Sequence, residues 1–202
     1  MKKILLLAVL ALALPTAMFA GSSVDYTNSG GTLSGSSSGL SLSGSVLIAV
    51  NGLNGGGLIT GSDLGSVSFA TGALSTGSLQ MGGTFAAGGW FTITGNGSDG
   101  VPSGTLFTGT FSGPVTWTLV TLANGTHNYT LTGSVSGWTG SGAAEQGVTV
   151  QLTINTGRGY FNGSTTISSG DTNIVVPEPG SLGLLGTGLI GLAGVVRRKL
   201  KS

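Results

Sequence analysis

The sequence predicts an all-β protein whose body is an antiparallel β-sandwich or barrel-like sheet, and three observations support this prediction. Apolar and polar residues alternate strictly over residues 147–155, which is the period of a strand with one buried face. Asn124 and Gly125 separate two β-rich runs within residues 114–136, and this pair favours a tight hairpin turn. Of the 202 residues 40 are Gly, and no window of a dozen body residues shows a helical period. A β-solenoid is the alternative, although no fixed-length repeat supports it.

Other segments of the body carry weaker strand patterns. Further strands are expected at residues 45–50, 66–70, 90–94, 105–112 and 165–175. Residues 24–45 are rich in Gly and Ser, so we expect this stretch to be weakly ordered or to form edge strands. The chain has no Cys, so its stability must come from apolar strand faces buried in a common core.

Residues 1–22 have the pattern of a secretory signal peptide. Lys2 and Lys3 precede an apolar run over residues 4–14, and small residues follow Pro15. As a helix this run would be about 16 Å long, too short to span a bilayer comfortably. The sequence therefore predicts export, with a Gly/Ser/Thr-rich β domain at residues 23–176.

Residues 177–202 form a tail with three successive parts. Pro177 and Pro179 flank Glu178 and favour a stiff, extended peptide. Residues 180–196 are uncharged and would form a helix about 26 Å long, near the lower limit for a single transmembrane helix. Such a helix followed by positive charge is expected to keep its C-terminus in the cytoplasm. The basic end consists of Arg197, Arg198 and Lys199.

The order of these parts resembles the PEP-CTERM sorting tail, with the motif at Val176, Pro177, Glu178 and Pro179. The resemblance implies that exosortase, a membrane-embedded processing enzyme, recognises the tail and cuts near the motif. It also implies a precursor tethered transiently to the inner membrane, then a body released to the cell surface or the extracellular matrix. The implied source is a bacterium that makes exopolysaccharide. Such tails are also named after an ice-binding protein, which implies little about the body.

Charge and composition exclude several classes of function. Residues 23–176 contain five acids and one strongly basic residue, Arg158, so a nucleic-acid partner is excluded. The sole imidazole, His127, lies beside the predicted hairpin turn and is expected to be structural, because no acid is placed to orient it. The oxygen-rich residues 95–100 lack the spaced acids of a calcium loop and are expected to form a turn. We therefore predict no enzymatic activity, no metal and no cofactor, with a hydrolase as the weaker alternative.

Tryptophan and threonine suggest two kinds of binding surface. Trp117 lies on an apolar strand face and is expected in the core, whereas Trp90 and Trp138 stand beside glycines and are candidates for glycan contact. Pairs such as Thr92 and Thr94 could form the hydroxyl array of an ice-binding surface or adhesin. They do not recur at constant spacing, so we interpret threonine as the favoured solvent-side residue of a strand.

The sequence as a whole predicts an exported, non-enzymatic protein of the cell surface or extracellular matrix. Exosortase is its expected processing partner, and exopolysaccharide is the expected environment of the body. A secreted carbohydrate-binding module is the alternative function.

Overall fold

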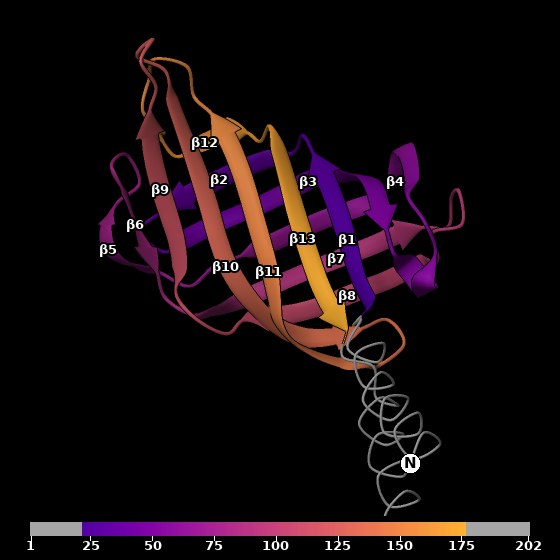
Figure 1. Ribbon diagram of the computed structural model, residues 1–202. Coiled ribbons are helices and arrows are strands. Elements are labelled where there is room, and N and C mark those ends of the chain that lie inside the picture. Colours follow the sequence, from indigo (N-terminus) through magenta and orange to yellow (C-terminus); the bar gives the residue numbers. More distant parts are fainter. Residues whose placement is uncertain (1–21, 177–202) are drawn as a thin grey trace, which may run out of the picture. The chain divides into compact units, whose positions relative to one another are not determined.

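The computed structural model describes residues 22–176, which form thirteen β-strands and one short 3₁₀ helix (Figure 1). The strands are β1 (Ser22–Ser29), β2 (Thr32–Ser36), β3 (Gly39–Asn51), β4 (Ile59–Ala70), β5 (Leu74–Ser78), β6 (Gly82–Phe85), β7 (Gly88–Asn96), β8 (Ser103–Phe111), β9 (Val115–Thr121), β10 (His127–Thr139), β11 (Ala144–Asn155), β12 (Ser164–Thr166) and β13 (Ser169–Val176). The 3₁₀ helix η1 (Leu53–Gly55) lies between β3 and β4. The predicted all-β fold class is confirmed.

The predicted signal peptide, C-terminal helix and basic end lie outside the described residues. Within residues 22–176, no helix has the length and apolar character needed to cross a membrane.

Eight strands close into an antiparallel barrel in the order β11-β13-β1-β3-β4-β7-β8-β10, and β10 pairs with β11 to complete the ring. The two 13-residue strands β3 and β10 are long enough to pair with two partners along one edge. β10 pairs with β9 through residues 127–132 and with β8 through residues 135–139. The alternative of a β-solenoid is wrong, because the chain closes its sheet by antiparallel pairing of strands remote in sequence.

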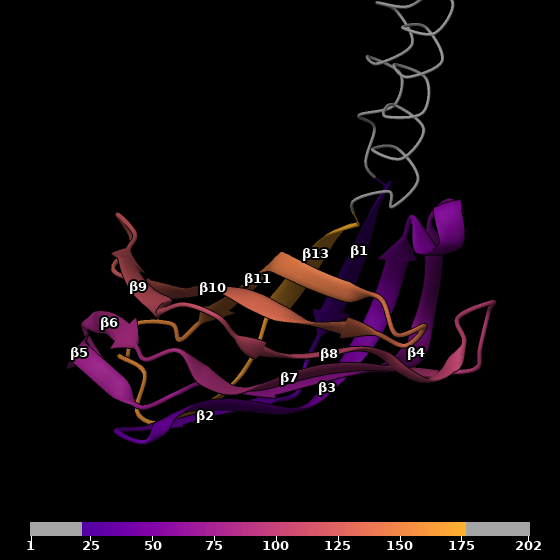
Figure 2. The same cartoon turned by 90° about the horizontal axis from the view of Figure 1, so that it is seen from below.

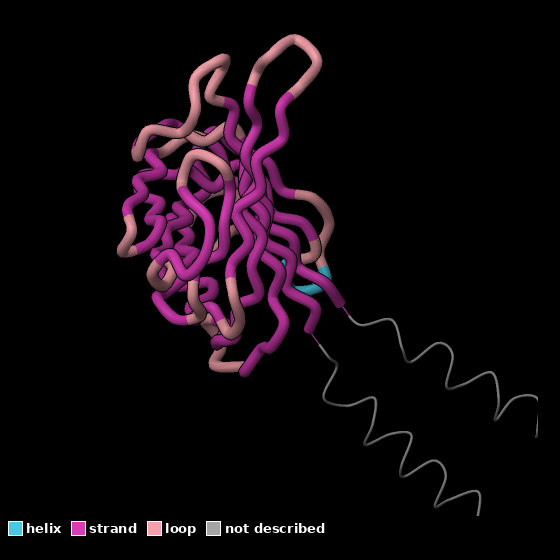
Figure 3. The backbone as a smooth tube through the Cα atoms, turned by 90° about the vertical axis from the view of Figure 1, so that its left-hand side faces the viewer, coloured by secondary structure: helices cyan, strands magenta, loops and turns pink. Residues whose placement is uncertain are grey.

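The barrel has two visible layers. In Figure 1, β9, β10, β11, β13 and β1 form the nearer layer, and β2, β3, β4, β7 and β8 run behind them at a steep angle. Figure 2 shows the two layers from below, and Figure 3 shows loops gathered at the strand ends. Side chains from the inner faces of both layers fill the space between them.

Strand alternation builds the core. In β11 the buried residues are Val148, Val150, Leu152 and Ile154, and the residues between them face outward. On β4, β7 and β8 the inner face carries phenylalanines whose ring centroids lie between 5.9 and 6.3 Å apart. This group consists of Phe69, Phe91, Phe107 and Phe111. Each buried side chain of this size contributes about 1.5–3 kcal/mol through the apolar surface it removes from water.

A second aromatic cluster lies where β9 pairs with β10. The Trp117 indole stacks on the Tyr129 ring at 4.8 Å, and the Phe161 ring packs edge-on against the indole at 5.6 Å. Trp117 Nε1–H donates to the Leu79 carbonyl (2.9 Å), and the Tyr129 hydroxyl donates to the Gln80 carbonyl (2.7 Å). The turn between β5 and β6 is thereby fixed over this end of the core. The expected core position of Trp117 is confirmed, since its side chain is 1% exposed.

The predicted hairpin is also confirmed. β9 and β10 pair through residues 116–121 and 127–132, with the turn at Asn124 and Gly125. Gly125 has a φ of 79°, in the left-handed region that glycine adopts without steric cost. The Asn124 Oδ1 accepts hydrogen bonds from the backbone N–H and the hydroxyl of Thr126, which fixes the turn locally.

The expectation for residues 24–45 is wrong. This stretch contains β1, β2 and the start of β3; β1 and β3 belong to the closed ring, and β2 pairs with both β3 and β12. Its few leucines are all buried: Leu33, Leu40 and Leu42 are at most 1% exposed. Small residues serve close packing here, since a Cβ at Gly31 would come within 2.7 Å of the backbone of Ser43 and Ser45. The Gly/Ser-rich composition therefore reflects strand proximity and not disorder.

Candidate functional site: a face of hydroxyls and two tryptophans

The outer side of β4, β7, β8 and β10 carries a surface that we call the tryptophan face. Its members are the outward-pointing side chains of these four strands, which alternate with the buried core residues. The members are Ser66, Ser68, Trp90, Thr92, Thr94, Thr108, Thr110, Ser136 and Trp138. The face therefore combines uncharged hydroxyl groups with two indoles.

The strand register places both tryptophans around β8. Trp138 of β10 lies opposite Thr108 of β8, and Thr108 lies opposite Thr92 of β7. Trp90 is two residues before Thr92 on the same strand, so it points to the same side. From the spacing of strands and residues, the two Cα atoms are about 12 Å apart. Trp90 is 47% exposed and Trp138 58% exposed, so both indoles are accessible to solvent.

The hydroxyl groups of the face bond to one another across strands. The Ser66 and Thr94 hydroxyls are 2.7 Å apart, and those of Thr92 and Thr108 are 3.3 Å apart. Each bond joins directly opposed residues of neighbouring strands. Such cross-strand pairs restrict the side-chain rotamers, so the hydroxyls of Thr92 and Thr108 between the tryptophans, and those of Ser66 and Thr94 at the pocket, are partly ordered before any ligand arrives.

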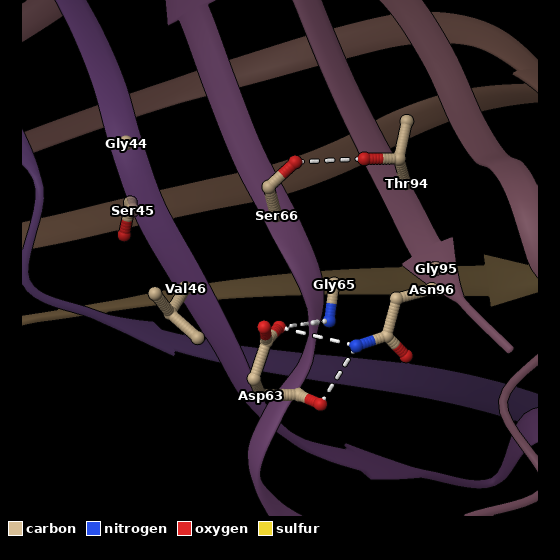
Figure 4. A pocket seen from close by; sticks show the side chains of 9 residues that line it. All are labelled: Gly44, Ser45, Val46, Asp63, Gly65, Ser66, Thr94, Gly95 and Asn96. Atoms are coloured by element: carbon tan, nitrogen blue, oxygen red, sulfur yellow. Dashed lines mark hydrogen bonds between the residues drawn. The ribbon is translucent and has the colours of Figure 1, made fainter. Parts of the chain in front are cut away.

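A shallow, open pocket of about 350 Å³ lies at one end of the tryptophan face (Figure 4). Ser66 and Thr94 belong to both the face and the pocket. Asn96 Nδ2 donates to the backbone carbonyl of Asp63 (2.8 Å) and to its Oδ1 (3.2 Å), and the Gly65 N–H also donates to Oδ1 (3.1 Å). Figure 4 shows the carboxylate and the amide turned toward each other at the pocket edge. The pocket therefore offers a polar ligand the hydroxyls of Ser66 and Thr94 and a carboxylate that the Asn96 amide holds in place.

The loop after β7 is a turn, as expected. The Asn96 Oδ1 accepts from the backbone N–H of Ser98, and the Val101 N–H donates to the Ser98 carbonyl. Asp99 adopts a φ of 53° within this turn. Among residues 22–176 there is no group of three or more His, Asp or Glu side chains arranged to hold a metal ion.

The predicted sorting residues lie at or beyond the end of β13. Val176 is the last residue of β13, and the remaining motif residues Pro177, Glu178 and Pro179 lie outside the described range. The basic end of Arg197, Arg198 and Lys199 also lies outside it. Trp90 and Trp138, the two candidates for glycan contact, lie on the same face.

His127 lies in the barrel wall next to the hairpin turn. It is 7% exposed, and its Nδ1 is 3.0 Å from the Thr121 hydroxyl. The Tyr160 ring stacks on the imidazole at 4.3 Å. The backbone N–H of His127 donates to the Gly157 carbonyl (2.7 Å). These contacts are those of a packed structural residue.

Two acids that the sequence did not single out lie on neighbouring strands. Asp25 of β1 and Asp171 of β13 are far apart in the chain but close in the barrel wall. Burial raises the pKa of the Asp25 carboxyl, and the nearby carboxylate of Asp171 raises it further. Tyr26, next to Asp25 but facing inward, has its pKa raised to about 12 by burial. No local signal could have found the acid pair, because it depends on the pairing of the first and last strands.

Glu145 is an acid inside the barrel. Its side chain is 3% exposed, and its Oε2 has no hydrogen-bond partner among the described residues. Across the β10–β11 pairing it faces Gly137, which faces Gly109 of β8, so the adjoining positions offer no side-chain donor. Burial raises the pKa of the Glu145 carboxyl, because the charged form loses its hydration.

Replacing Glu145 with Met should increase the free energy of unfolding at neutral pH by about 1 kcal/mol, because the change removes a buried polar group without a partner. The raised pKa means that the folded state holds the proton more tightly than the unfolded state. The wild-type protein therefore loses stability as the pH rises from the unfolded pKa through the folded pKa. The gain from Glu145→Met should shrink at acidic pH. Urea unfolding of both proteins at acidic and at neutral pH measures the gain in the free energy of unfolding. An equal gain at the two pH values would contradict the prediction.

The comparisons with known proteins concern the tail. The PEP-CTERM protein-sorting motif matches residues 175–199, which confirms the resemblance predicted from the sequence. This motif indicates export, a membrane-anchored precursor, processing by exosortase and sorting toward the cell surface. No curated protein and no solved structure matches the chain.

Proposed function

Because residues 175–199 carry a PEP-CTERM protein-sorting motif, we propose that the chain is a non-enzymatic protein of the cell surface or extracellular matrix that associates with exopolysaccharide. The motif accounts for delivery to the cell surface. The described body, residues 22–176, would then supply the contact with polysaccharide.

The observation that carries this proposal is the chemistry of the tryptophan face. Polysaccharides present many hydroxyl groups and, on the faces of their sugar rings, apolar C–H groups. Serine and threonine hydroxyls both donate and accept hydrogen bonds, and an indole offers a flat apolar face with a negative quadrupole. The exposed Trp90 and Trp138 together with the hydroxyls between them match both parts of a sugar surface.

Two arrangements support a role without catalysis. His127 is packed beneath Tyr160 and bonded to Thr121, which leaves it poorly placed to act as a general base. The pKa of Asp25 is raised by burial and by the nearby Asp171, but both acids lie on the outer side of the barrel wall, where Asp171 is exposed. Neither feature lies on the tryptophan face.

The proposal is tested by following the protein in cells that make exopolysaccharide and in an otherwise identical strain that does not. We expect the protein to fractionate with the matrix in the first strain and to appear mainly in the free medium in the second. Incubation of the purified protein with the same polysaccharide should release no new reducing ends. Equal distribution in the two strains would refute the association, and release of reducing ends would refute the non-enzymatic role.

A further inference from the structure

We propose that Trp90 and Trp138 hold one and the same polysaccharide chain, which crosses β8, and that this chain is neutral. The inference rests on the proposed association with exopolysaccharide and adds to it a binding site and a ligand class.

The geometry favours a shared ligand. The two tryptophans lie on either side of β8 with their Cα atoms about 12 Å apart, and the register places only threonines of β7 and β8 between them. Thr108 faces Trp138 directly, and Thr110 is two residues further along β8 on the same side. A chain of sugars lying across this strand would meet an indole on each side and hydroxyl groups in the middle. A ligand the size of a single sugar is too short to contact both indoles at once.

The surface between the indoles is prepared for sugar hydroxyls. Thr92 and Thr108 share a hydrogen bond of 3.3 Å, so a bound sugar would meet hydroxyls whose orientation is already restricted. Ordering before binding reduces the entropy lost on association. The pocket at the end of the face adds the Asp63 carboxylate, whose oxygen atoms can accept hydrogen bonds from further hydroxyl groups of the same chain.

Charge favours a neutral polysaccharide. Arg158 is the only Lys or Arg among residues 22–176, and it lies far from the tryptophan face. Its neighbour Gly157 accepts from the backbone of His127, the first residue of β10, whereas Trp138 stands near the end of that strand. The separation along β10 is on the order of 30 Å, beyond the Debye length at physiological ionic strength. The carboxylate of Asp63 lines the pocket together with Ser66 and Thr94 of the face, and it repels anionic sugars.

The test uses the full-length protein, purified in a detergent without a sugar head group so that the detergent does not compete. The probe is exopolysaccharide from the producing cells, separated by anion exchange into an unretained neutral fraction and a retained acidic fraction. We expect affinity electrophoresis to show binding to the neutral fraction only. Trp90→Ala and Trp138→Ala should each weaken binding at least tenfold, and Trp138→Phe should retain most of it.

Tyr160→Ala is the matched control, because it removes an aromatic side chain that is also about half exposed, at 49%, but lies off the tryptophan face. Its binding should equal that of the wild type. Binding to neither fraction would refute the proposed function itself. Binding to the acidic fraction alone, or binding that survives either Trp→Ala change, would overturn this inference while leaving the proposed function intact. Inhibition of ice recrystallisation without polysaccharide binding would assign the face to ice and overturn both.

Discussion

Replacing Pro177, Glu178 and Pro179 together with alanine should leave most of the protein in the membrane fraction instead of at the cell surface or in the medium. These residues form the core of the PEP-CTERM protein-sorting motif matched at residues 175–199. The two prolines restrict their own φ and push the preceding residues to extended conformations, which suits entry into a processing enzyme. Alanines have high helix propensity and would remove both the stiffness and the charge. Cell fractionation with immunoblotting measures the shift.

Pro102→Ala provides the matched control, because it removes a proline from the body and leaves the motif intact. Its distribution between membrane and medium should equal that of the wild type. Mass spectrometry of the released wild-type protein should find a C-terminus near the motif. Release of the triple variant at the wild-type level, or a released product that still ends at Ser202, would contradict processing at this site.

Segments with a strong local pattern could be predicted from sequence. The alternation over residues 147–155 lies within β11, and the Asn124–Gly125 pair lies at the turn between β9 and β10. In both cases the signal is contained in the segment itself. A period of two identifies the buried face, and a turn that requires a positive φ identifies the reversal of the chain.

Strands made largely of Gly, Ser and Thr could not be predicted in this way. β5 and β6 carry few apolar residues, and β2 lies in the stretch that the sequence predicts to be weakly ordered or to form edge strands. These strands owe their conformation to remote partners: Gly83 of β6 lies opposite Trp117 of β9, and Thr165 of β12 lies opposite Leu33 of β2. Pairing over such sequence distances leaves no periodic trace in either segment. The predicted strand at residues 165–175 is divided between β12, which pairs with β2, and β13, which pairs with β11.

The candidate site, too, was predictable where the signal is local and unpredictable where it depends on strand pairing. Glycine neighbours singled out Trp90 and Trp138 as exposed residues, but their common face depends on register. A register shift between Gly88 and Phe91 interrupts the pairing of β7 with β8 beside Trp90. Because a shift of one residue turns a side chain to the opposite face of a sheet, the sequence alone could not show that both indoles point outward around β8.

Replacing Trp117 with alanine should lower the free energy of unfolding by about 3–5 kcal/mol, the range for removal of a large buried aromatic side chain. The change removes the stacking of the indole on Tyr129 and its edge contact with Phe161, and it leaves the Leu79 carbonyl without its donor. A small domain has a total stability of about 5–15 kcal/mol, so this single change removes a large part of it. Urea unfolding followed by tyrosine fluorescence or far-UV circular dichroism measures the loss.

Trp90→Ala is the matched control, since it makes the same chemical change on the surface of the same barrel. Its effect should be about half that of Trp117→Ala or less, because Trp90 is 47% exposed and much of its surface already contacts water. Trp117→Phe should fall between the two, because the smaller ring keeps part of the packing but cannot bond the Leu79 carbonyl. Equal effects of Trp117→Ala and Trp90→Ala would mean that the cluster of Trp117, Tyr129 and Phe161 does not anchor the turn between β5 and β6. The turn would then have to be held by the pairing of β6 with β9, which places Gly83 opposite Trp117.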